Sequence, residues 1–271
     1  MERARSFGAV AEDYERYRPG YPESLVALVS EVADGPVRRA IEIGAGTGKA
    51  TRTFAGAGIE VVATDPDAEM LTVLRRECAG LPVTTVRAAL EDLDPADHQP
   101  FDLLYAAAAW HWTAPETRWD RAAALVRDGG AVAFFGGPFE LADDEVAAVE
   151  KEMIAAYAPE GRHLPPPSPP DAPMLFPGDE MLADDRLRDV RQWEVRRRFV
   201  LAREDYLRHL DTISAIRILP DAGRSALFAD LAAGLPEQVE VRADLMLHTA
   251  RRVSGSASDS QSPHSGSRPP A

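Results

Sequence analysis

Three glycines at alternate positions, Gly44, Gly46 and Gly48, follow the apolar run 40–43 and precede a segment of helical character. Glycine allows a sharp turn and lets a ligand approach main-chain amides, because no Cβ stands in the way. Asp65 follows a second β-rich run, where a carboxylate can accept hydrogen bonds from both hydroxyls of a ribose. The glycines and the acid together predict a nucleoside pocket.

The spacing of the glycines narrows the choice of cofactor. A dinucleotide fingerprint reads Gly-x-Gly-x-x-Gly, whereas residues 44–48 read Gly-x-Gly-x-Gly, and position 49 is Lys49. Acidic Glu42 before the turn suits a cofactor that carries an ammonium group, not a pyrophosphate at a helix N-terminus. The pattern therefore favours S-adenosylmethionine over NAD.

The elements around this turn alternate between strand and helix, as in a parallel sheet built from βαβ units. The predicted strands cover 40–43, 59–64, 82–86, 101–107 and 131–135, and the predicted helices cover 48–57, 67–79 and 116–127. Beyond residue 136 the alternation stops. An acidic helix over 140–158 and a proline-rich connector over 164–173 indicate an inserted lid.

The remaining segments complete a predicted division of the chain. Strands over 193–201 and 238–253, with helices over 203–217 and 221–233 between them, could complete the sheet. Two helical pieces separated at Pro19 and Pro22 form an arm before the sheet. We expect an N-terminal arm over the cofactor (1–36), a cofactor-binding α/β core (37–136), a lid insertion (137–192), the last two strands with lid helices (193–253) and a disordered tail (254–271).

Composition excludes several classes of protein. The formal net charge of -14 and sequence pI near 4.9 disfavour a protein that binds nucleic acid through its phosphates. The single cysteine, Cys78, cannot form an internal disulfide or a cysteine zinc site. No stretch is apolar enough for a membrane span, so we expect a cytoplasmic protein. We expect it to be a monomer or a homodimer.

Five stretches of sequence carry a resemblance to a known family. They are residues 7–22, with Tyr14, Arg18 and Tyr21; 42–48, with the glycines; 65–71, Asp-Pro-Asp-Ala-Glu-Met-Leu; 90–93, Leu-Glu-Asp-Leu; and 101–112, which end in Trp110-His111-Trp112. Over residues 5–253 the chain resembles the class I S-adenosylmethionine-dependent methyltransferases, in the branch of trans-aconitate-methyltransferase-like proteins.

The resemblance implies a fold and a set of binding residues. The fold would be a Rossmann-like α/β sheet of seven strands, the last antiparallel, with helices on both faces and an inserted helical lid. Glu42 and the loop Gly44, Ala45, Gly46, Thr47 and Gly48 would line the methionine end of the cofactor. Asp65 would hold the ribose, Pro66 and Met70 would flank the adenine, and Leu90 and Glu91 would meet its edge. Ala107 would lie beside the cofactor, and Tyr14 and Arg18 would close over its carboxylate.

His111 is the only base that the sequence suggests. It follows the fourth predicted strand, and an imidazole can accept a proton near neutral pH. The alternative is that His111 caps the next segment while Trp110 and Trp112 pack. A base is needed for a phenol, alcohol or carbon acceptor, and a carboxylate acceptor needs none.

Three further polar features are weaker candidates for a functional role. His209 accompanies an apolar stripe on a predicted lid helix, which favours a lid or surface position. Arg196, Arg197 and Arg198 alternate along a strand, which indicates a solvated face, with one arginine as a candidate clamp for an acidic substrate. His248, on the last predicted strand, is a similarly weak candidate. No grouping has metal-ligand spacing, and no hydrolase elbow or phosphate loop occurs.

These patterns lead to one expected function and one alternative. We expect methyl transfer from S-adenosylmethionine to a small molecule, with O-methylation ahead of C- and N-methylation. The acidic, partly apolar lid favours a hydrophobic or cationic acceptor, such as a secondary metabolite, and the apolar turn 134–139 argues against a polyacid. The alternative is a protein of the same fold that binds the cofactor without methylating.

Overall fold

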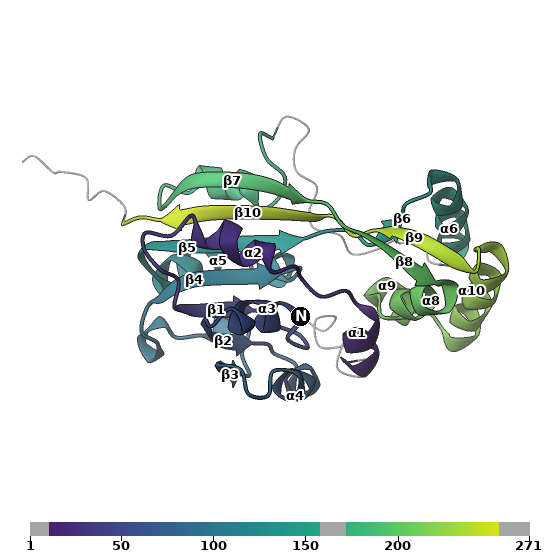
Figure 1. Cartoon of the computed structure of the whole chain (residues 1–271), viewed down its shortest axis with the longest axis horizontal. Coiled ribbons are helices and arrows are strands. Elements are labelled where there is room, and N and C mark those ends of the chain that lie inside the picture. Colours follow the sequence, from purple (N-terminus) through teal and green to yellow (C-terminus); the bar gives the residue numbers. More distant parts are fainter. Residues whose placement is uncertain (1–10, 158–171, 255–271) are drawn as a thin grey trace, which may run out of the picture.

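A computed structural model of the chain describes residues 11–157 and 172–254. The predicted connector over 164–173 and the predicted tail from residue 254 lie almost wholly outside these ranges. The described residues form a large sheet flanked by helices at one end and a smaller cap of helices on a short sheet at the other (Figure 1).

The large sheet has seven strands in the order β3-β2-β1-β4-β5-β10-β7. Its strands are β1 (Arg39–Ile43), β2 (Glu60–Thr64), β3 (Val83–Val86), β4 (Phe101–Ala107), β5 (Val126–Gly136), β7 (Leu187–Val195) and β10 (Leu245–Arg252). The first five pair in parallel, β10 runs antiparallel to β5, and β7 runs antiparallel to β10. The predicted seven-stranded methyltransferase sheet with reversed final pairing is confirmed.

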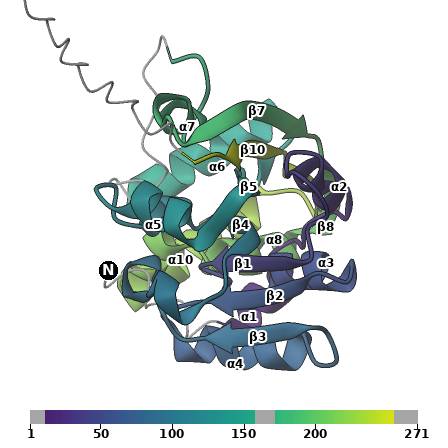
Figure 2. The ribbon, with the colours of Figure 1, turned by 90° about the vertical axis from the view of Figure 1, so that its left-hand side faces the viewer.

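Helices cover both faces of this sheet, as the end-on view shows (Figure 2). They are α2 (Ser24–Ser30), α3 (Lys49–Gly56), α4 (Ala68–Glu77), α5 (Arg118–Leu125) and α7 (Gly178–Ala183), with 3-10 turns η3 (Leu90–Asp92), η4 (Pro95–Asp97) and η5 (Trp110–Trp112). One apolar core joins α2, α3 and α4 to the sheet through Leu25, Phe54 and Leu74. The other joins α5 and α7 to the opposite face through Leu125 and Met181.

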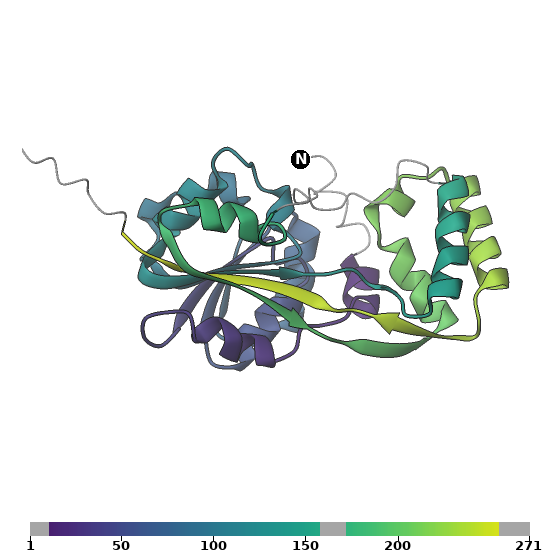
Figure 3. The same ribbon diagram turned by 90° about the horizontal axis from the view of Figure 1, so that it is seen from above.

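The cap is built on a three-stranded antiparallel sheet in the order β6-β9-β8. Its elements are β6 (Glu140–Leu141), α6 (Asp144–Tyr157), β8 (Arg198–Ala202), α8 (Arg203–Asp211), α9 (Ser214–Arg217), α10 (Asp221–Gly234) and β9 (Gln238–Arg242). A separate apolar core, with Tyr206, Leu227 and Val241 fully buried, holds these helices together. Figure 3 shows the cap beyond one end of the large sheet.

The late strands differ from the prediction. Where one strand is predicted over 193–201 and another over 238–253, the structure divides each in two, at Arg196–Arg197 and at Ala243–Asp244. Strands β7 and β10 belong to the large sheet, and strands β8 and β9 belong to the sheet of the cap. The two segments therefore cross side by side between the large sheet and the cap. At the crossing, Asp244 Oδ1 accepts a hydrogen bond from the Arg197 main-chain N–H at 2.7 Å. In a continuous sheet a main-chain carbonyl of the neighbouring strand would accept this bond.

The arm before the sheet contains α1 (Ala11–Tyr17) and α2, separated by the two prolines as predicted. Helix α1 lies between α4 of the core and α8 of the cap. Arg76 donates to both carboxylate oxygens of Glu12 on the core side, and Arg18 Nε donates to Thr212 Oγ1 at 2.8 Å on the cap side. The arm therefore bridges the two parts of the molecule.

Candidate active site

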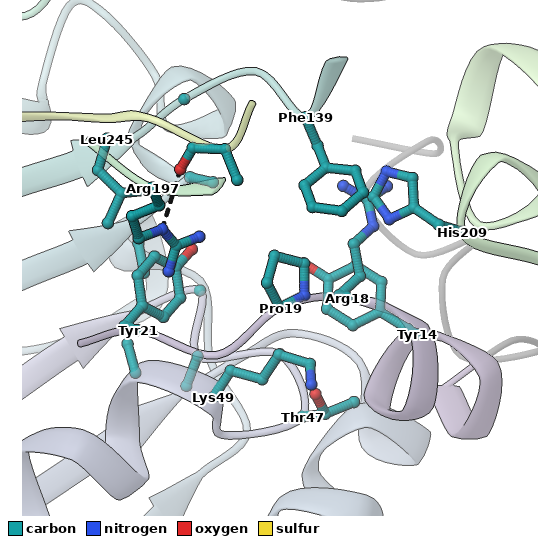
Figure 4. Close-up of a pocket in the computed structure, with 18 of the residues that line it drawn as sticks. Tyr14, Arg18, Pro19, Tyr21, Thr47, Lys49, Phe139, Arg197, His209 and Leu245 are labelled. Carbon is teal, nitrogen blue, oxygen red and sulfur yellow. Dashed lines mark hydrogen bonds between the residues drawn. The ribbon is translucent and has the colours of Figure 1, made fainter. Parts of the chain in front are cut away.

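A cavity lies where the glycine loop, the arm and the cap meet (Figure 4). The loop after β1 forms one wall, and residues 14–21 of the arm form another. The turn after β5 and the two crossing segments between the sheets complete it. Because the loop follows the carboxyl end of a central parallel strand, the cavity occupies the position where open α/β sheets bind ligands.

The glycine loop has a backbone that suits close approach of a ligand. Gly44 and Gly46 have φ values of +68° and +56°, in the left-handed region that side chains disfavour. A Cβ on Gly44 would stand 2.5 Å from the Cβ of Ala109, so this position is filled by the end of β4. A Cβ on Gly46 would meet nothing within 4 Å, so the loop presents bare main chain to the cavity there.

Glu42 lies beneath this loop and is fully buried. Its Oε2 accepts hydrogen bonds from Thr51 Oγ1 at 2.6 Å and from the Tyr105 hydroxyl at 3.0 Å. Its Oε1 is buried and has no hydrogen-bond donor among the described residues. Burial raises the pKa of Glu42 to about 8, against the lowering effect of the two donors. At neutral pH this carboxyl is therefore mostly protonated, and one of its oxygens has no partner among the described residues.

A second buried polar atom lies on the same loop. Thr47 is 1% exposed, and its Oγ1 has no partner in the described part of the chain. Buried polar groups are normally hydrogen-bonded, and exceptions in native structures mark strain or a missing ligand. Glu42 and Thr47 are both lining residues of the cavity, so a polar ligand bound there could supply the missing partners of the two atoms.

Asp65, at the end of β2, supports the loop from the side. Its Oδ2 accepts from the Gly46 main-chain N–H at 2.9 Å, and its Oδ1 accepts from the Asp67 N–H at 2.8 Å. Burial raises the pKa of Asp65 to about 6, while these two hydrogen bonds act to lower it. The carboxylate predicted to hold a ribose thus also fixes the glycine turn.

The arm brings three further side chains to the cavity. Arg18 lies over the ring of Tyr14, with its Cζ 5.1 Å from the ring centroid, and both line the cavity. The Tyr21 ring packs edge-on against Phe135 at 5.1 Å between centroids. Burial raises the pKa of Tyr21 above its usual range, so its phenol stays neutral. The two predicted arm residues and Tyr21 are therefore brought together.

Another cation, Lys49, begins α3 behind the arm. Its Nζ lies 3.4 Å from Glu15 Oε1 and donates to the Glu15 carbonyl oxygen at 2.5 Å. Desolvation lowers the pKa of Lys49, and the charge of Glu15 acts against that shift. Lys49 is thus neutralised by the arm, although it lines the cavity.

The cap and its crossing segments supply the wall that the sequence did not predict. Phe139 and His209 pack with their ring centroids 4.1 Å apart, and His209 is almost fully buried. In the view of Figure 4 they face Arg197 and Tyr21 across the cavity. The interpretation of His209 as a lid residue is consistent with its place on α8, but its side chain points inward.

The structure separates the remaining predicted residues into two groups. Those that line the cavity with the glycines are Tyr14, Arg18, Glu42, Ala45, Thr47 and Ala107. Those that lie outside its lining are Gly48, Asp65, Pro66, Met70, Leu90, Glu91 and His111. The second group, apart from Gly48 and His111, follows β2 and β3, beside the part of the loop that Asp65 supports.

Several members of the second group have structural contacts. Met70 is buried against Ala11 of the arm, and Leu90 is buried in the core under α5. Glu91 accepts a hydrogen bond from the Ala114 main-chain N–H at 2.6 Å. His111 lies on η5 after β4, half-buried, with its ring centroid 5.0 Å from that of Trp112. Their assignment to the adenine and to catalysis stays a prediction.

Several residues of the cavity lining were not among those predicted to bind the cofactor or to act in catalysis. The main ones are Tyr21, Lys49, Phe139, Arg197, His209 and Leu245. Tyr21 belongs to a quoted motif, and Arg197 belongs to a noted arginine run, so both had a weak signal. Phe139 and Leu245 are ordinary apolar residues, and only the crossing of the two late segments brings them to the site.

His248 has a structural role in the described structure. Burial lowers the pKa of His248 to about 4, and its ring nitrogen lies 2.9 Å from Gln192 Oε1. A neutral imidazole in this position links β10 to β7 away from the cavity. No cluster of three or more metal-ligating side chains occurs in residues 11–157 and 172–254. Within those same ranges no helix has the length and apolar character of a membrane span.

Comparison with known families agrees with this geometry. The family model described as a methyltransferase domain matches residues 40–130, which run from β1 into β5 and include the glycine loop. Residues 40–130 are thus similar in sequence to a methyltransferase domain, and they include the loop and the strand ends that border the cavity. The cofactor of this family is the one that the glycine spacing predicted.

Individual relatives match a little under half of the chain. An uncharacterized methyltransferase of Mycobacterium tuberculosis is 39% identical over 125 residues, which cover 46% of this chain and 49% of that protein. A protein provisionally named as an S-adenosylmethionine-dependent methyltransferase in Saccharomyces cerevisiae is 30% identical over 126 residues, or 45% of this chain and 43% of that protein. The chain spans about half the length of the curated relatives it matches.

Solved structures extend the likeness of the fold across the methyltransferase domain and the cap. A protein of Anaeromyxobacter dehalogenans, provisionally assigned as a type II methyltransferase, superposes with a TM-score of 0.62 at 24% identity. The superposition covers 88% of this chain and 99% of that one. At this identity the match shows the fold alone.

Proposed function

We propose that this chain transfers a methyl group from S-adenosylmethionine to a small-molecule acceptor bound between the methyltransferase domain and the cap. One observation carries the proposal: the cavity beside the bare main chain of Gly46 holds two buried polar atoms, Glu42 Oε1 and Thr47 Oγ1, without protein partners. The family of residues 40–130 supplies the chemistry that such a site would serve.

The residues present fit the methionine end of this cofactor. Glu42 Oε1 can accept a hydrogen bond from an ammonium group, and Arg18 with the Tyr14 phenol can bind a carboxylate. Gly46 allows close approach to main-chain N–H groups, and Asp65 stands at the end of β2 for a ribose. When bound, the cofactor supplies an electrophilic methyl group on a sulfonium that leaves neutral.

The chain's own contribution is alignment and exclusion of water. The arm is pinned to the core by Arg76 and to the cap by Arg18, so the site is covered on the side away from the sheet. Phe139 and Leu245 present apolar surface to the cavity, which limits the water that can compete with the acceptor. Positioning of this kind can account for much of a methyl transfer, because the displacement needs no acid.

The finer assignments are part of the proposal. We assign the chain by resemblance to the trans-aconitate-methyltransferase-like branch, and O-methylation is our first choice ahead of N- and C-methylation. His111 is the proposed base for an acceptor that must lose a proton. Its place outside the cavity lining means that it would act only if η5 borders the acceptor once the cofactor is bound. The cytoplasmic location and the monomeric or homodimeric state stay predictions from the sequence.

A second candidate function is cofactor binding without methylation. The many side chains that close this cavity, among them Arg18 on Thr212, would suit a protein that holds the cofactor for another purpose. One result separates the two functions. An enzyme gives methylated product with a member of a broad panel of acceptors, and a protein that only binds the cofactor gives none.

Calorimetric titration with S-adenosylmethionine, S-adenosylhomocysteine and NAD tests the proposal. We expect micromolar dissociation constants for the first two and no heat from NAD. Transfer of labelled methyl from S-adenosylmethionine to a pooled panel of small molecules then separates the enzyme from the binding protein. Binding of NAD alone would overturn the function and the cofactor assignment together.

A further inference from the structure

Arg197 presents a guanidinium group to the cavity from the crossing between β7 and β8. Its Nε donates to the Ala243 carbonyl at 2.9 Å, and its Nη1 donates to the Gly20 carbonyl at 2.6 Å. Both acceptors are neutral. Among the described residues no carboxylate forms an ion pair with Arg197, and no hydrogen bond from its Nη2 occurs.

The nearest acid does not serve as the missing partner. Asp244 Oδ1 accepts from the Arg197 main-chain N–H, and Asp244 forms an ion pair at 3.2 Å with Arg198. Arg198 is exposed and takes up that negative charge. Desolvation lowers the pKa of Arg197, which indicates that its environment disfavours the charge it carries.

The cavity lining carries more positive than negative side chains, and the cofactor does not balance this excess of positive charge. The lining cations are Arg18, Lys49 and Arg197, and Glu42 is the one acidic side chain in the lining formed by the described residues. Lys49 is paired with Glu15. S-adenosylmethionine brings one carboxylate, one ammonium and one sulfonium, so it can pair with Arg18 and Glu42 and still adds a positive charge. Arg197 is then left with no ion-pair partner among the described residues, at a half-buried position on the cavity wall.

From this imbalance, and resting on the proposed function, we infer that the methyl acceptor carries a carboxylate that Arg197 binds with the help of the Tyr21 hydroxyl. A guanidinium matches a carboxylate in shape, and a neutral phenol can donate to the same group. Burial keeps Tyr21 protonated, as that donation requires. One guanidinium balances one negative charge, which favours a monocarboxylate over a phosphate dianion or a polyacid.

This inference changes the acceptor expected from composition. An acidic cap favoured a hydrophobic or cationic molecule, but the acidic residues of α6 do not line the cavity. Phe139 and Leu245 provide apolar surface opposite and beside Arg197. The acceptor class that fits is therefore an organic acid with an apolar body and a single carboxylate.

The first measurement separates the acceptor site from the cofactor site. S-adenosylhomocysteine is titrated into the wild type, Arg197→Gln and Arg18→Gln by calorimetry. We expect Arg197→Gln to bind within about threefold of the wild type and Arg18→Gln to bind at least about tenfold more weakly, because a lost charge-assisted contact costs about 1.5–3 kcal/mol. Loss of affinity in Arg197→Gln would assign Arg197 to the cofactor and overturn the inference. No binding to the wild type would instead overturn the proposed function.

The second measurement uses paired probes on the complex saturated with S-adenosylhomocysteine. Benzoate, hexanoate and indole-3-acetate are compared with benzamide, hexanamide and indole-3-acetamide, with phenyl phosphate as the dianion. We expect at least one acid to bind about tenfold or more tightly than its amide in the wild type and in Arg197→Lys, and the preference to fall below about threefold in Arg197→Gln.

Arg196→Gln is the matched control, because Arg196 is the exposed neighbour and pairs only with Glu194 at 3.6 Å among the described acids. It should keep the preference for the acid. Because Arg197 also links Gly20 to Ala243, the stability of each variant is measured by thermal unfolding. If the role of Arg197 were purely structural, its substitution would lower stability without changing the ratio of acid to amide affinity. Equal binding of acids and amides to the wild type, a preference that survives in Arg197→Gln, or stronger binding of phenyl phosphate would each overturn the inference.

Discussion

The buried carboxyl of Glu42 couples cofactor binding to pH, and the substitution Glu42→Gln isolates that coupling. With a pKa of about 8, close to nine-tenths of the Glu42 side chains in the empty protein are protonated at pH 7. A bound ammonium group requires the ionised form. Ionising Glu42 at pH 7 therefore costs about 1.4 kcal/mol, or roughly tenfold in affinity.

The expected result is a release of about 0.9 proton per cofactor bound at pH 7, and an affinity that rises about tenfold from pH 6 to pH 7. The rise should end near pH 8, where the α-amino group of the cofactor itself loses its proton. Calorimetry in buffers of different ionisation enthalpy measures the released proton directly. Glu42→Gln should release none and show no rise, because its amide does not titrate.

The same residue predicts a pH dependence of stability in the protein without cofactor. The pKa of Glu42 is raised from 4.5 in the unfolded chain to about 8 in the folded protein, so its contribution is fully present below pH 4.5 and is lost as pH rises toward 8. Relative to Glu42→Gln, the wild type should lose about 3–4 kcal/mol between pH 5 and pH 8. Urea denaturation at the two pH values measures this difference.

Glu60→Gln is the matched control, because Glu60 lies on the neighbouring strand with an exposed side chain. Its stability relative to the wild type should change little over the same range. A difference between wild type and Glu42→Gln that stays constant from pH 5 to pH 8 would show that Glu42 titrates as an ordinary glutamate. Proton release that persists in Glu42→Gln would refute the ammonium contact.

Three further substitutions test the site. Asp65→Ala should weaken S-adenosylhomocysteine binding about tenfold or more, because it removes the charge-assisted contact with the ribose and the hydrogen bond that supports Gly46. Unchanged calorimetric affinity in a folded variant would contradict the assignment of the pocket. Gly46→Ala should lower the free energy of unfolding by only about 1–2 kcal/mol, because residue 46 has a φ of +56°. The same substitution should abolish cofactor binding, because the new Cβ would occupy the space of the ligand. Tight binding by this variant would place the cofactor elsewhere. His111→Asn should lower kcat about 100-fold or more without changing cofactor affinity, and an unchanged kcat would remove His111 from the chemistry.

The sequence predicted the part of the fold that depends on local pattern. The run 101–107 begins directly after Pro100, and it forms β4 over those same residues. The alternation of strands with glycine-ended helices fixes a parallel sheet, because consecutive βα units pack in few ways. The glycine loop was predictable for the same reason, since its backbone conformation is set by its own residues.

The division of the late strands was not predictable from alternation. Residues 187–202 contain two extended segments, and the alternation of inward and outward side chains continues from 193 to 202, through the end of the first and the whole of the second. Nothing in this alternation marks Arg196–Arg197 as the point where the chain crosses between the sheets. The break depends on Asp244, which accepts from the Arg197 main chain across 47 positions of sequence. A contact of that range is a property of packing, and local patterns do not contain it.

The position of Arg197 follows from the same break. In a continuous strand over 193–201, alternation would place Arg197 on one face with Val195 and Phe199, and Arg196 with Arg198 on the other. The structure keeps Arg197 on the face of Phe199, with its Cζ 5.3 Å from the centroid of that ring. At the crossing its side chain also donates to Gly20 of the arm and to Ala243 of the second crossing segment. The arm, the large sheet and the cap thus meet at one guanidinium, and any movement of the cap relative to the sheet must move Arg197. A carboxylate bound there would therefore contact the arm, the large sheet and the cap through a single charge.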